Sequence, residues 1–417
     1  MATLTRRNFL KGATMFGAAM LAREVIPSWM PRLAFAQDGV QGDVIVCVFL
    51  RGGADALNII APFGDEDYYL ARPTLALAQP DRRVASATLD LDGFFGLNPD
   101  MVAIHELLTS GRMTAIHAVG APHVSRSHFA AMDLIERGTD GEGGANTGWL
   151  GRYLAETARG QESPLRAIGW GDSLQTSLRG YLSATALKSI TDYHLASEEP
   201  LAMQASLAAL YQEDNALDQS AINTINALDL VSQVDVDAYI PAHGASYSET
   251  EFGRGLKQTA ALIKADAGLE VACVDMGGYD THVTQGAIAS QGIGAFPVLV
   301  TELANNLRAF HDDLLDYENK VTVVVMSEFG RRVQENGAGG TDHGHGGVMF
   351  VMSPKLAQIS VIGDYPGINP NFLDNGDLAI TTDYRDVLSE ILLRRTHLES
   401  AQSVFPDHVL SDIGLFT

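Results

Sequence analysis

The segment Val44-Ile45-Val46-Cys47-Val48-Phe49-Leu50 leads directly into Arg51-Gly52-Gly53-Ala54-Asp55. Seven consecutive apolar residues, most of them β-branched, are typical of a strand that is buried on both faces of a parallel sheet. Similar runs occur later in the chain, at 113–119, 271–276, 321–326 and 348–352. Because segments with helical spacing separate these runs, the sequence predicts an α/β fold with a doubly wound, mostly parallel sheet.

Helical periodicity is clearest in the second half of the chain. Apolar side chains recur on one face of each of two predicted helices, Phe252, Leu256 and Ile263 on the first and Leu299, Leu303, Leu307, Phe310 and Leu314 on the second. A last helix is expected to begin at Thr382 or Asp383. Residues 176–236 are dominated by Ala, Leu, Gln and Asp, which predicts a helical cap or insertion within one domain spanning 37–417.

The first 36 residues have the pattern of a twin-arginine signal peptide. Thr5-Arg6-Arg7-Asn8-Phe9-Leu10-Lys11 precedes a mildly apolar run at 12–22, and Ala34-Phe35-Ala36 resembles a cleavage site. That run has roughly half the length that spans a bilayer as a helix, so no transmembrane anchor is expected in the mature chain. We expect export by the twin-arginine translocase to the periplasm or the cell exterior. The alternative is a cytoplasmic amphipathic helix that contains Arg-Arg by coincidence.

The charge balance makes one class of partner unfavourable. The 417 residues include 28 basic and 51 acidic side chains, and removal of residues 1–36 takes away five basic residues and one acidic residue. The mature chain then carries a formal charge of −27, so a nucleic-acid partner is not expected. The two cysteines, Cys47 and Cys273, lie in apolar runs where thiols act as small buried hydrophobes. Their spacing does not decide whether they form a disulfide.

Polar residues follow the predicted strands at the edge where open α/β sheets hold ligands. After the first strand, a glycine turn presents Asp55, either as a metal or substrate ligand or as a helix N-cap. After the second strand, Ser125 and Ser127 precede a helical stretch. The backbone N–H groups and the dipole at that helix start suit an anion. The alternative is that a serine only caps the helix.

Two later strand ends carry the strongest indications of a metal site. Asp280 and His282 follow the strand at 271–276, and their spacing lets a carboxylate and an imidazole point the same way from an extended loop. Glu328 follows the strand at 321–326, and Asp342-His343-Gly344-His345 precedes the last strand among several glycines. Carboxylate and imidazole groups bind zinc and similar divalent ions, and these polar clusters have no role in forming a core.

Five motifs occur in order along the mature chain: Leu50-Arg51-Gly52-Gly53-Ala54-Asp55, Ser127-His128-Phe129, Gly278-Tyr279-Asp280-Thr281-His282, Ser327-Glu328-Phe329-Gly330-Arg331 and Gly340-Thr341-Asp342-His343-Gly344. Together they resemble an exported bacterial family, domain of unknown function 1501, over nearly all of the mature chain. That family is similar in fold to the alkaline phosphatase and sulfatase superfamily. The resemblance therefore implies a doubly wound sheet of alkaline phosphatase-like type that holds one or two divalent metal ions, with zinc favoured.

The resemblance also implies roles for single residues. Ser127 would be the nucleophile, with Ser125 as its substitute. The groups that hold anionic oxygens would be Arg331, Arg126 and His128. The metal ligands would be Asp55, Asp280, His282, Glu328, Asp342 and His343, with His345 as an extra ligand. A two-metal centre would activate the nucleophile or a water molecule and stabilise the entering and leaving oxygens.

The chain departs from the superfamily pattern in two respects. It has no Cys/Ser-x-Pro-x-Arg stretch, which excludes a formylglycine-type sulfatase. The Asp280-x-His282 spacing is tighter than the Asp-x-x-x-His of the phosphatases, and Glu328 stands where they have Asp-His. We expect a metal-dependent hydrolase of phosphate or sulfate esters that acts on an anionic small-molecule or polymer substrate. The alternative is a non-catalytic exported envelope protein that keeps the fold for binding or assembly.

Overall fold

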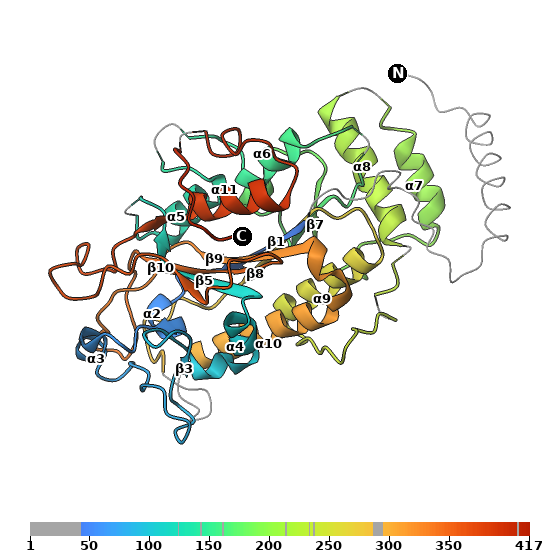
Figure 1. Cartoon of the computed structure of the whole chain (residues 1–417). Coiled ribbons are helices and arrows are strands. Elements are labelled where there is room, and N and C mark those ends of the chain that lie inside the picture. Colours follow the sequence, from blue (N-terminus) through green and yellow to red (C-terminus); the bar gives the residue numbers. More distant parts are fainter. Residues whose placement is uncertain are drawn as a thin grey trace, which may run out of the picture.

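The computed structural model describes residues 43–417 except 124, 142–143, 161, 213–214, 233, 237, 287–294 and 407. The signal peptide predicted at 1–36 lies outside the described residues. The described part is a mixed α/β structure built on a large, mostly parallel sheet, as the sequence predicts (Figure 1). Within this part, no helix combines the length and the apolar character needed to cross a membrane.

The large sheet has the strand order β11-β5-β10-β9-β1-β8-β6-β7, with β12 paired to β5. Its strands are β1 (Val44–Leu50), β5 (Met113–Gly120), β6 (Ala167–Trp170), β7 (Ala184–Leu187), β8 (Val271–Met276), β9 (Val321–Ser327), β10 (Gly347–Met352), β11 (Val361–Ile362) and β12 (Thr382–Asp383). Only β10 runs antiparallel to its neighbours among these described strands. The carboxyl ends of β1, β5, β8 and β9 therefore lie at one edge, where β10 begins.

Helices cover both faces of this sheet because the side chains of β1 alternate between two cores. Val46 and Val48 pack with α4 (Val102–Thr109), α9 (Glu251–Lys264) and α10 (Phe296–Asp313). Cys47 and Phe49 pack with α5 (His128–Arg137), α6 (Trp149–Glu156) and α11 (Tyr384–Arg395). Figure 1 shows these two groups of helices on opposite sides of the strands.

The last helix begins where the sequence indicates. Asp383 is the N-cap of α11, and its side chain accepts a hydrogen bond from the N–H of Arg385. Val387 and Ile391 of this helix are buried. The helices predicted around Leu256 and Leu303 are α9 and α10, and both of these leucines are buried.

The segment 176–236 contains a strand as well as helices. β7 pairs in parallel with β6 at the edge of the sheet, and α7 (Pro200–Ala208) and α8 (Ala216–Val231) follow it. The sequence carries no clear signal for β6 or β7, because the segments AIGW and ATAL are short and contain few β-branched residues. In Figure 1, α7 and α8 lie beyond β7, away from α5 and from α2 (Ala56–Ile59).

A small second sheet lies between β1 and β5 in the sequence. It has the order β2-β4-β3, formed by β2 (Ile60–Ala61), β3 (Leu89–Asp90) and β4 (Gly96–Leu97). The short helix α3 (Glu66–Ala71) lies between β2 and β3 in the chain, and its N-cap Asp65 accepts a hydrogen bond from the N–H of Asp67.

The two cysteines lie on adjacent central strands. Cys47 of β1 is the register partner of Cys273 of β8, and both are free, buried thiols. A hydrogen bond with Cys47 and burial raise the pKa of Cys273. The hydroxyl of Ser177 lies 3.6 Å from the Cys273 sulfur.

Candidate metal centre

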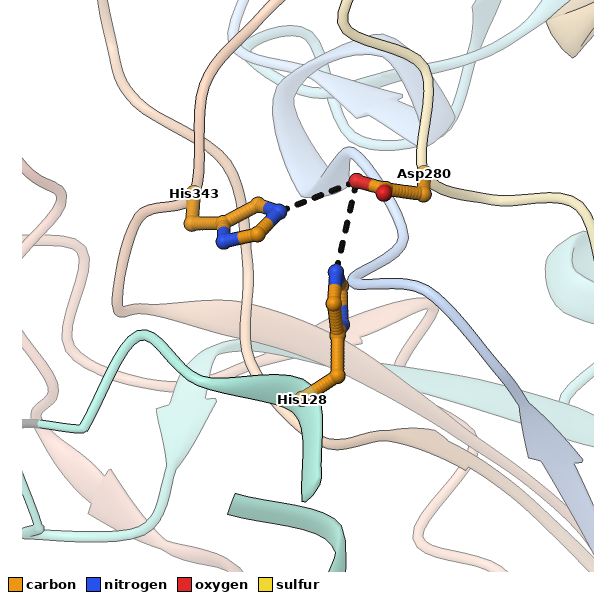
Figure 2. A group of neighbouring side chains, drawn as sticks. All are labelled: His128, Asp280 and His343. Carbon is orange, nitrogen blue, oxygen red and sulfur yellow. Dashed lines mark hydrogen bonds and ion pairs between the residues drawn. The ribbon is translucent and has the colours of Figure 1, made fainter. Parts of the chain in front are cut away.

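Four donor atoms converge at the carboxyl edge of the sheet. Nε2 of His343 lies 2.9 Å from Oδ1 of Asp280. Nε2 of His282 and Nε2 of His128 lie 3.0 and 3.4 Å from the same oxygen, and Nε2 of His282 lies 2.9 Å from Nε2 of His343. Figure 2 shows the rings of His128 and His343 directed at the Asp280 carboxylate. We call these four residues the donor cluster.

The ends of three strands position the donor cluster. His128 is the first residue of α5, which follows β5. Asp280 and His282 lie in the loop after β8, and His343 lies in the loop between β9 and β10. These segments are distant in sequence and adjacent in space because their strands share the carboxyl edge of the sheet.

Carboxylates outside the cluster orient two of its imidazoles. Nδ1 of His128 lies 2.7 Å from Oε1 of Glu328, and Nδ1 of His282 lies 2.9 Å from Oδ1 of Asp342. An ionised carboxylate only accepts hydrogen bonds, so each Nδ1 is the donor and carries the hydrogen. In a neutral ring, Nε2 then presents its lone pair to the cluster. The hydrogen bond with His282 also lowers the pKa of Asp342.

A backbone carbonyl orients the third imidazole in the same way. Nδ1 of His343 lies 2.8 Å from the carbonyl oxygen of Arg126, which can only accept. Three Nε2 atoms therefore surround Oδ1 of Asp280, and those of His282 and His343 also lie next to each other. Lone pairs at this spacing repel, and a cation among them converts the repulsion into attraction.

The donor cluster has the chemistry to bind a divalent cation, and the donor atoms of His128, Asp280 and His343 all lie within 4.8 Å of one another. Zinc binds imidazole nitrogen and carboxylate oxygen at about 2.0–2.1 Å, so tetrahedral ligands lie about 3.3 Å apart. A carboxylate or carbonyl behind each imidazole is the usual outer partner of a metal-binding histidine. The side chains are 21% exposed at His128 and His343, 37% at His282 and 48% at Asp280. Solvent and a substrate can therefore reach the donors.

Arg331 holds Asp280 from the interior of the protein. The buried guanidinium of Arg331 donates from Nη2 to Oδ1 of Asp280 at 2.8 Å. Its other hydrogen bonds go to the backbone carbonyl oxygens of Gly52, Gly53, Tyr279 and Thr341. Burial alone would raise the pKa of Asp280, but its interactions with the His343 ring and with the Arg331 guanidinium outweigh burial and hold that pKa well below its usual range. The predicted substrate-binding group Arg331 is thus used within the protein.

The glycine turn after β1 lets two parts of the site approach closely. A Cβ atom at Gly52 would lie 2.5 Å from the backbone nitrogen of Asp280, and φ at Gly52 is +119°. The N–H of Gly52 donates to Oε1 of Glu328 at 2.9 Å. A residue with a side chain at this position would push the Asp280 loop away from β1.

The aromatic ring of Phe329 packs against two imidazoles of the donor cluster, a role that was not predicted from the sequence. Its buried ring lies 5.0 Å from the ring of His128 and 5.1 Å from the ring of His343, between centroids. The packing limits rotation of both imidazoles. The residue belongs to the Ser327-Glu328-Phe329-Gly330-Arg331 motif, which is the signal that points to it.

The structure brings together three of the predicted metal ligands. Asp280, His282 and His343 belong to the donor cluster. Glu328 also lies at the site, but it is 2% exposed and contacts the Nδ1 side of His128 rather than the cluster. His128, predicted to hold anionic oxygens, contributes a donor atom instead. Glu328 therefore orients His128 and does not offer a donor to the cluster itself.

The other predicted ligands lie outside the donor cluster. Asp342 orients His282 and is not directed at the cluster centre. Asp55 is buried in an ion pair with Nη1 of Arg72 at 2.6 Å. Nδ1 of His345 lies 3.1 Å from Oδ2 of Asp374, and its Nε2 lies 3.1 Å from a backbone carbonyl oxygen. Both ring nitrogens of His345 therefore have partners elsewhere.

The predicted nucleophile lies beside the donor cluster. Ser127 is the N-cap residue of α5, directly before His128, and its exposed side chain makes no capping hydrogen bond. The hydroxyl of Ser125 accepts a hydrogen bond from the N–H of Ser127 at 3.3 Å. The Ser127 hydroxyl thus does not act as the cap that the alternative interpretation requires.

Residues 108–397 match the family model described as protein of unknown function (DUF1501). The chain belongs to the DUF1501 family. This match confirms the family resemblance found in the sequence. The matched range contains the whole donor cluster but not the glycine turn that follows β1. No curated protein matches the chain.

Two solved structures have a low similarity to this DUF1501 protein. One is the crystal structure of Ps i-CgsB, with 12% identity and a TM-score of 0.35 over 86% of this chain and 73% of that chain. The other is Ps i-CgsB in complex with k-i-k-neocarrahexaose, with 12% identity and a TM-score of 0.34 over 90% and 75%. A similarity this low does not assign a function.

Proposed function

We propose that this DUF1501 protein is a metal-dependent hydrolase of phosphate or sulfate esters. The observation that supports the proposal is the convergence of three imidazole lone pairs and one carboxylate oxygen at an accessible sheet edge. We propose a single ion with zinc favoured, and a sheet of alkaline phosphatase-like type. A divalent cation bound there would act as a Lewis acid on an ester oxygen and lower the pKa of a nearby hydroxyl or water.

Ser127 is the proposed nucleophile. Its free hydroxyl adjoins His128, and the N–H groups at the start of α5 favour developing negative charge. Attack of Oγ on the phosphorus or sulfur atom would release the alcohol, which takes its proton from solvent. Water would then release the inorganic anion and restore the serine hydroxyl. Ser125, two residues earlier in the chain, is the second candidate for this role.

Replacement of Ser127 by alanine tests this role. We expect turnover of an aryl phosphate or aryl sulfate to fall by at least about a hundredfold, because the covalent step is lost. Metal content and melting temperature should stay close to those of the wild type, since the Ser127 hydroxyl contributes no capping bond. Ser125→Ala is the companion variant, because a fall in turnover in that variant alone would assign the role to Ser125. A loss of about 1 kcal/mol in stability with unchanged turnover would instead show a helix cap.

A non-catalytic envelope protein with a structural metal is the second candidate function. The observation that favours it is the number of donors, since structural zinc sites have four protein ligands and catalytic sites usually keep one position open. The two candidates differ in a direct measurement. Bound metal without turnover of any aryl phosphate or aryl sulfate would favour the structural role.

We also propose that the N-terminal segment directs export of the folded chain to the periplasm or cell exterior through the twin-arginine translocase. The Arg6-Arg7 pair is the part of the signal that the receptor recognises. Replacement of both residues by lysine is expected to keep the full-length precursor in the cytoplasm, as measured by cell fractionation. The comparison is the precursor with Lys11→Arg, which retains the pair. Normal export of the double-lysine variant would contradict the proposal.

A further inference from the structure

Two arginine side chains share one buried carboxylate next to the donor cluster. Asp377 is 1% exposed, its Oδ2 forms an ion pair with Arg126, and its Oδ1 lies 3.7 Å from Nε of Arg332. One negative charge therefore faces two positive charges. The nearby carboxylate of Asp342 also acts on Arg332 electrostatically, but it is hydrogen-bonded to His282.

The backbones of both arginines form hydrogen bonds with the loop that carries His343. The carbonyl oxygen of Arg126 accepts the hydrogen bond from Nδ1 of His343 at 2.8 Å. The N–H of Arg332 donates to the carbonyl oxygen of Asp342 at 2.9 Å. The two backbones thus bond to consecutive residues of the same loop, so both arginines lie next to the loop that carries His343.

The guanidinium groups of Arg126 and Arg332 are open to solvent. Their side chains are 39% and 36% exposed, whereas Arg331 is fully buried and its N–H groups are used within the protein. A turn holds Arg332 in place. Its Nη1 donates to the carbonyl oxygen of Asn375 at 3.1 Å, and a Cβ atom at Gly376 would lie 2.6 Å from that nitrogen. The glycine leaves the space that the guanidinium occupies.

The chain carries a formal charge of −23, so its general surface repels anions. The two exposed guanidinium groups lie near two further carboxylates, but Asp342 is engaged by His282 and Asp374 by His345. Guanidinium groups bind phosphate, sulfate and carboxylate through two parallel hydrogen bonds. The two guanidinium groups can therefore bind an oxyanion, and their positions determine where that oxyanion lies relative to the donor cluster.

We propose that Arg126 and Arg332 form a second anion subsite, which binds an oxyanion group of the substrate other than the ester that reacts. The substrate class is then an ester with at least two anionic groups, multiply phosphorylated or multiply sulfated. The substrate assignment rests on the proposed hydrolase function. The binding of an oxyanion by the two arginines does not, and it can be measured without turnover.

The test measures binding of inorganic phosphate and of inorganic sulfate to the chelator-treated, folded protein by isothermal titration calorimetry. Without metal, the arginine subsite is the site under test. We expect Arg126→Met and Arg332→Met each to lower the anion affinity by about tenfold or more, because charge-assisted hydrogen bonds are lost. Comparison of the two anions shows which group the subsite prefers.

The matched control is Arg394→Met. Arg394 is exposed at the end of α11 and lies next to Arg395, which pairs with Asp43 at the opposite edge of the sheet. Its replacement should change the anion affinity by less than about twofold, since it removes a distant charge. Circular dichroism of all variants checks that each one is folded.

The outcomes separate the subsite from the proposed function. Unchanged anion affinity in both Arg126→Met and Arg332→Met, or no measurable anion binding, would overturn the subsite while leaving the hydrolase proposal intact. Loss of affinity in both variants supports the subsite, even if no ester is hydrolysed. With active protein, the kcat/KM for a doubly anionic ester relative to a singly anionic one should also fall in both variants.

Discussion

Replacement of His343 by alanine is expected to remove bound metal from the purified protein. The variant loses the donor that lies within 2.9 Å of both Asp280 and His282. Loss of an outer hydrogen-bond partner alone lowers metal affinity by about 10–100-fold, so loss of a donor should exceed that range. Elemental analysis and titration with zinc measure the effect. A chelator should produce the same state in the wild-type chain.

The stability of the protein should change together with its metal content. A free metal concentration a hundred times the dissociation constant stabilises the native state by about 2.7 kcal/mol, so metal should raise the melting temperature of the wild type but not that of His343→Ala. Glu328→Gln should fall between the two, because it weakens the hydrogen bond that orients His128 but removes no donor atom of the cluster. The matched control is His345→Ala, whose ring nitrogens have other partners. If His345→Ala lost the metal and His343→Ala kept it, the donor cluster would be wrong.

Replacement of Arg331 by methionine should destabilise the protein by about 3–5 kcal/mol. The buried guanidinium donates to four backbone carbonyl oxygens, and each buried polar group left without a partner costs about 1–3 kcal/mol. The Asp280 carboxylate is 48% exposed, so solvent reduces the cost of losing its ion pair. Chemical denaturation measures the free energy of unfolding. Metal affinity should fall as well, because Asp280 loses the group that fixes its position.

The neighbouring residue provides the control for Arg331. Arg332→Met removes a guanidinium that is 36% exposed and 3.7 Å from its carboxylate, so the free energy of unfolding should change by less than about 1 kcal/mol. Equal stability of Arg331→Met and the wild type would show that Arg331 is not the central support of the site.

The central strands were predictable because their signal is local. β1 is a continuous run of seven apolar residues, which indicates a buried strand whatever its partners are. β6 and β7 carry no such run. They are strands because β6 pairs with β8 on one side and with β7 on the other, and such pairing depends on contacts between distant segments. The same reason explains why the sequence predicts only helices for 176–236.

The candidate site was predictable by residue type but not by atomic role. Asp280, His282 and His343 stand out because polar side chains directly after core strands have no packing function. The positions of His128 and Glu328 depend on a hydrogen bond between residues 200 positions apart, which no local pattern contains. The Gly-Gly turn presents Asp55 as a ligand in the sequence, and the buried Arg72 ion pair becomes visible only in the folded chain.

The in-register cysteines make the central strands of the sheet observable in solution. Cys47 and Cys273 are the only cysteines of the chain, and both are buried. A thiol reacts as its thiolate, and the raised pKa of Cys273 keeps that form scarce. Alkylation of either thiol therefore requires that β1 and β8 separate or that the protein unfolds. The labelling rate of the native protein thus reports how often these two strands open, and they are the strands that carry the glycine turn and the Asp280 loop.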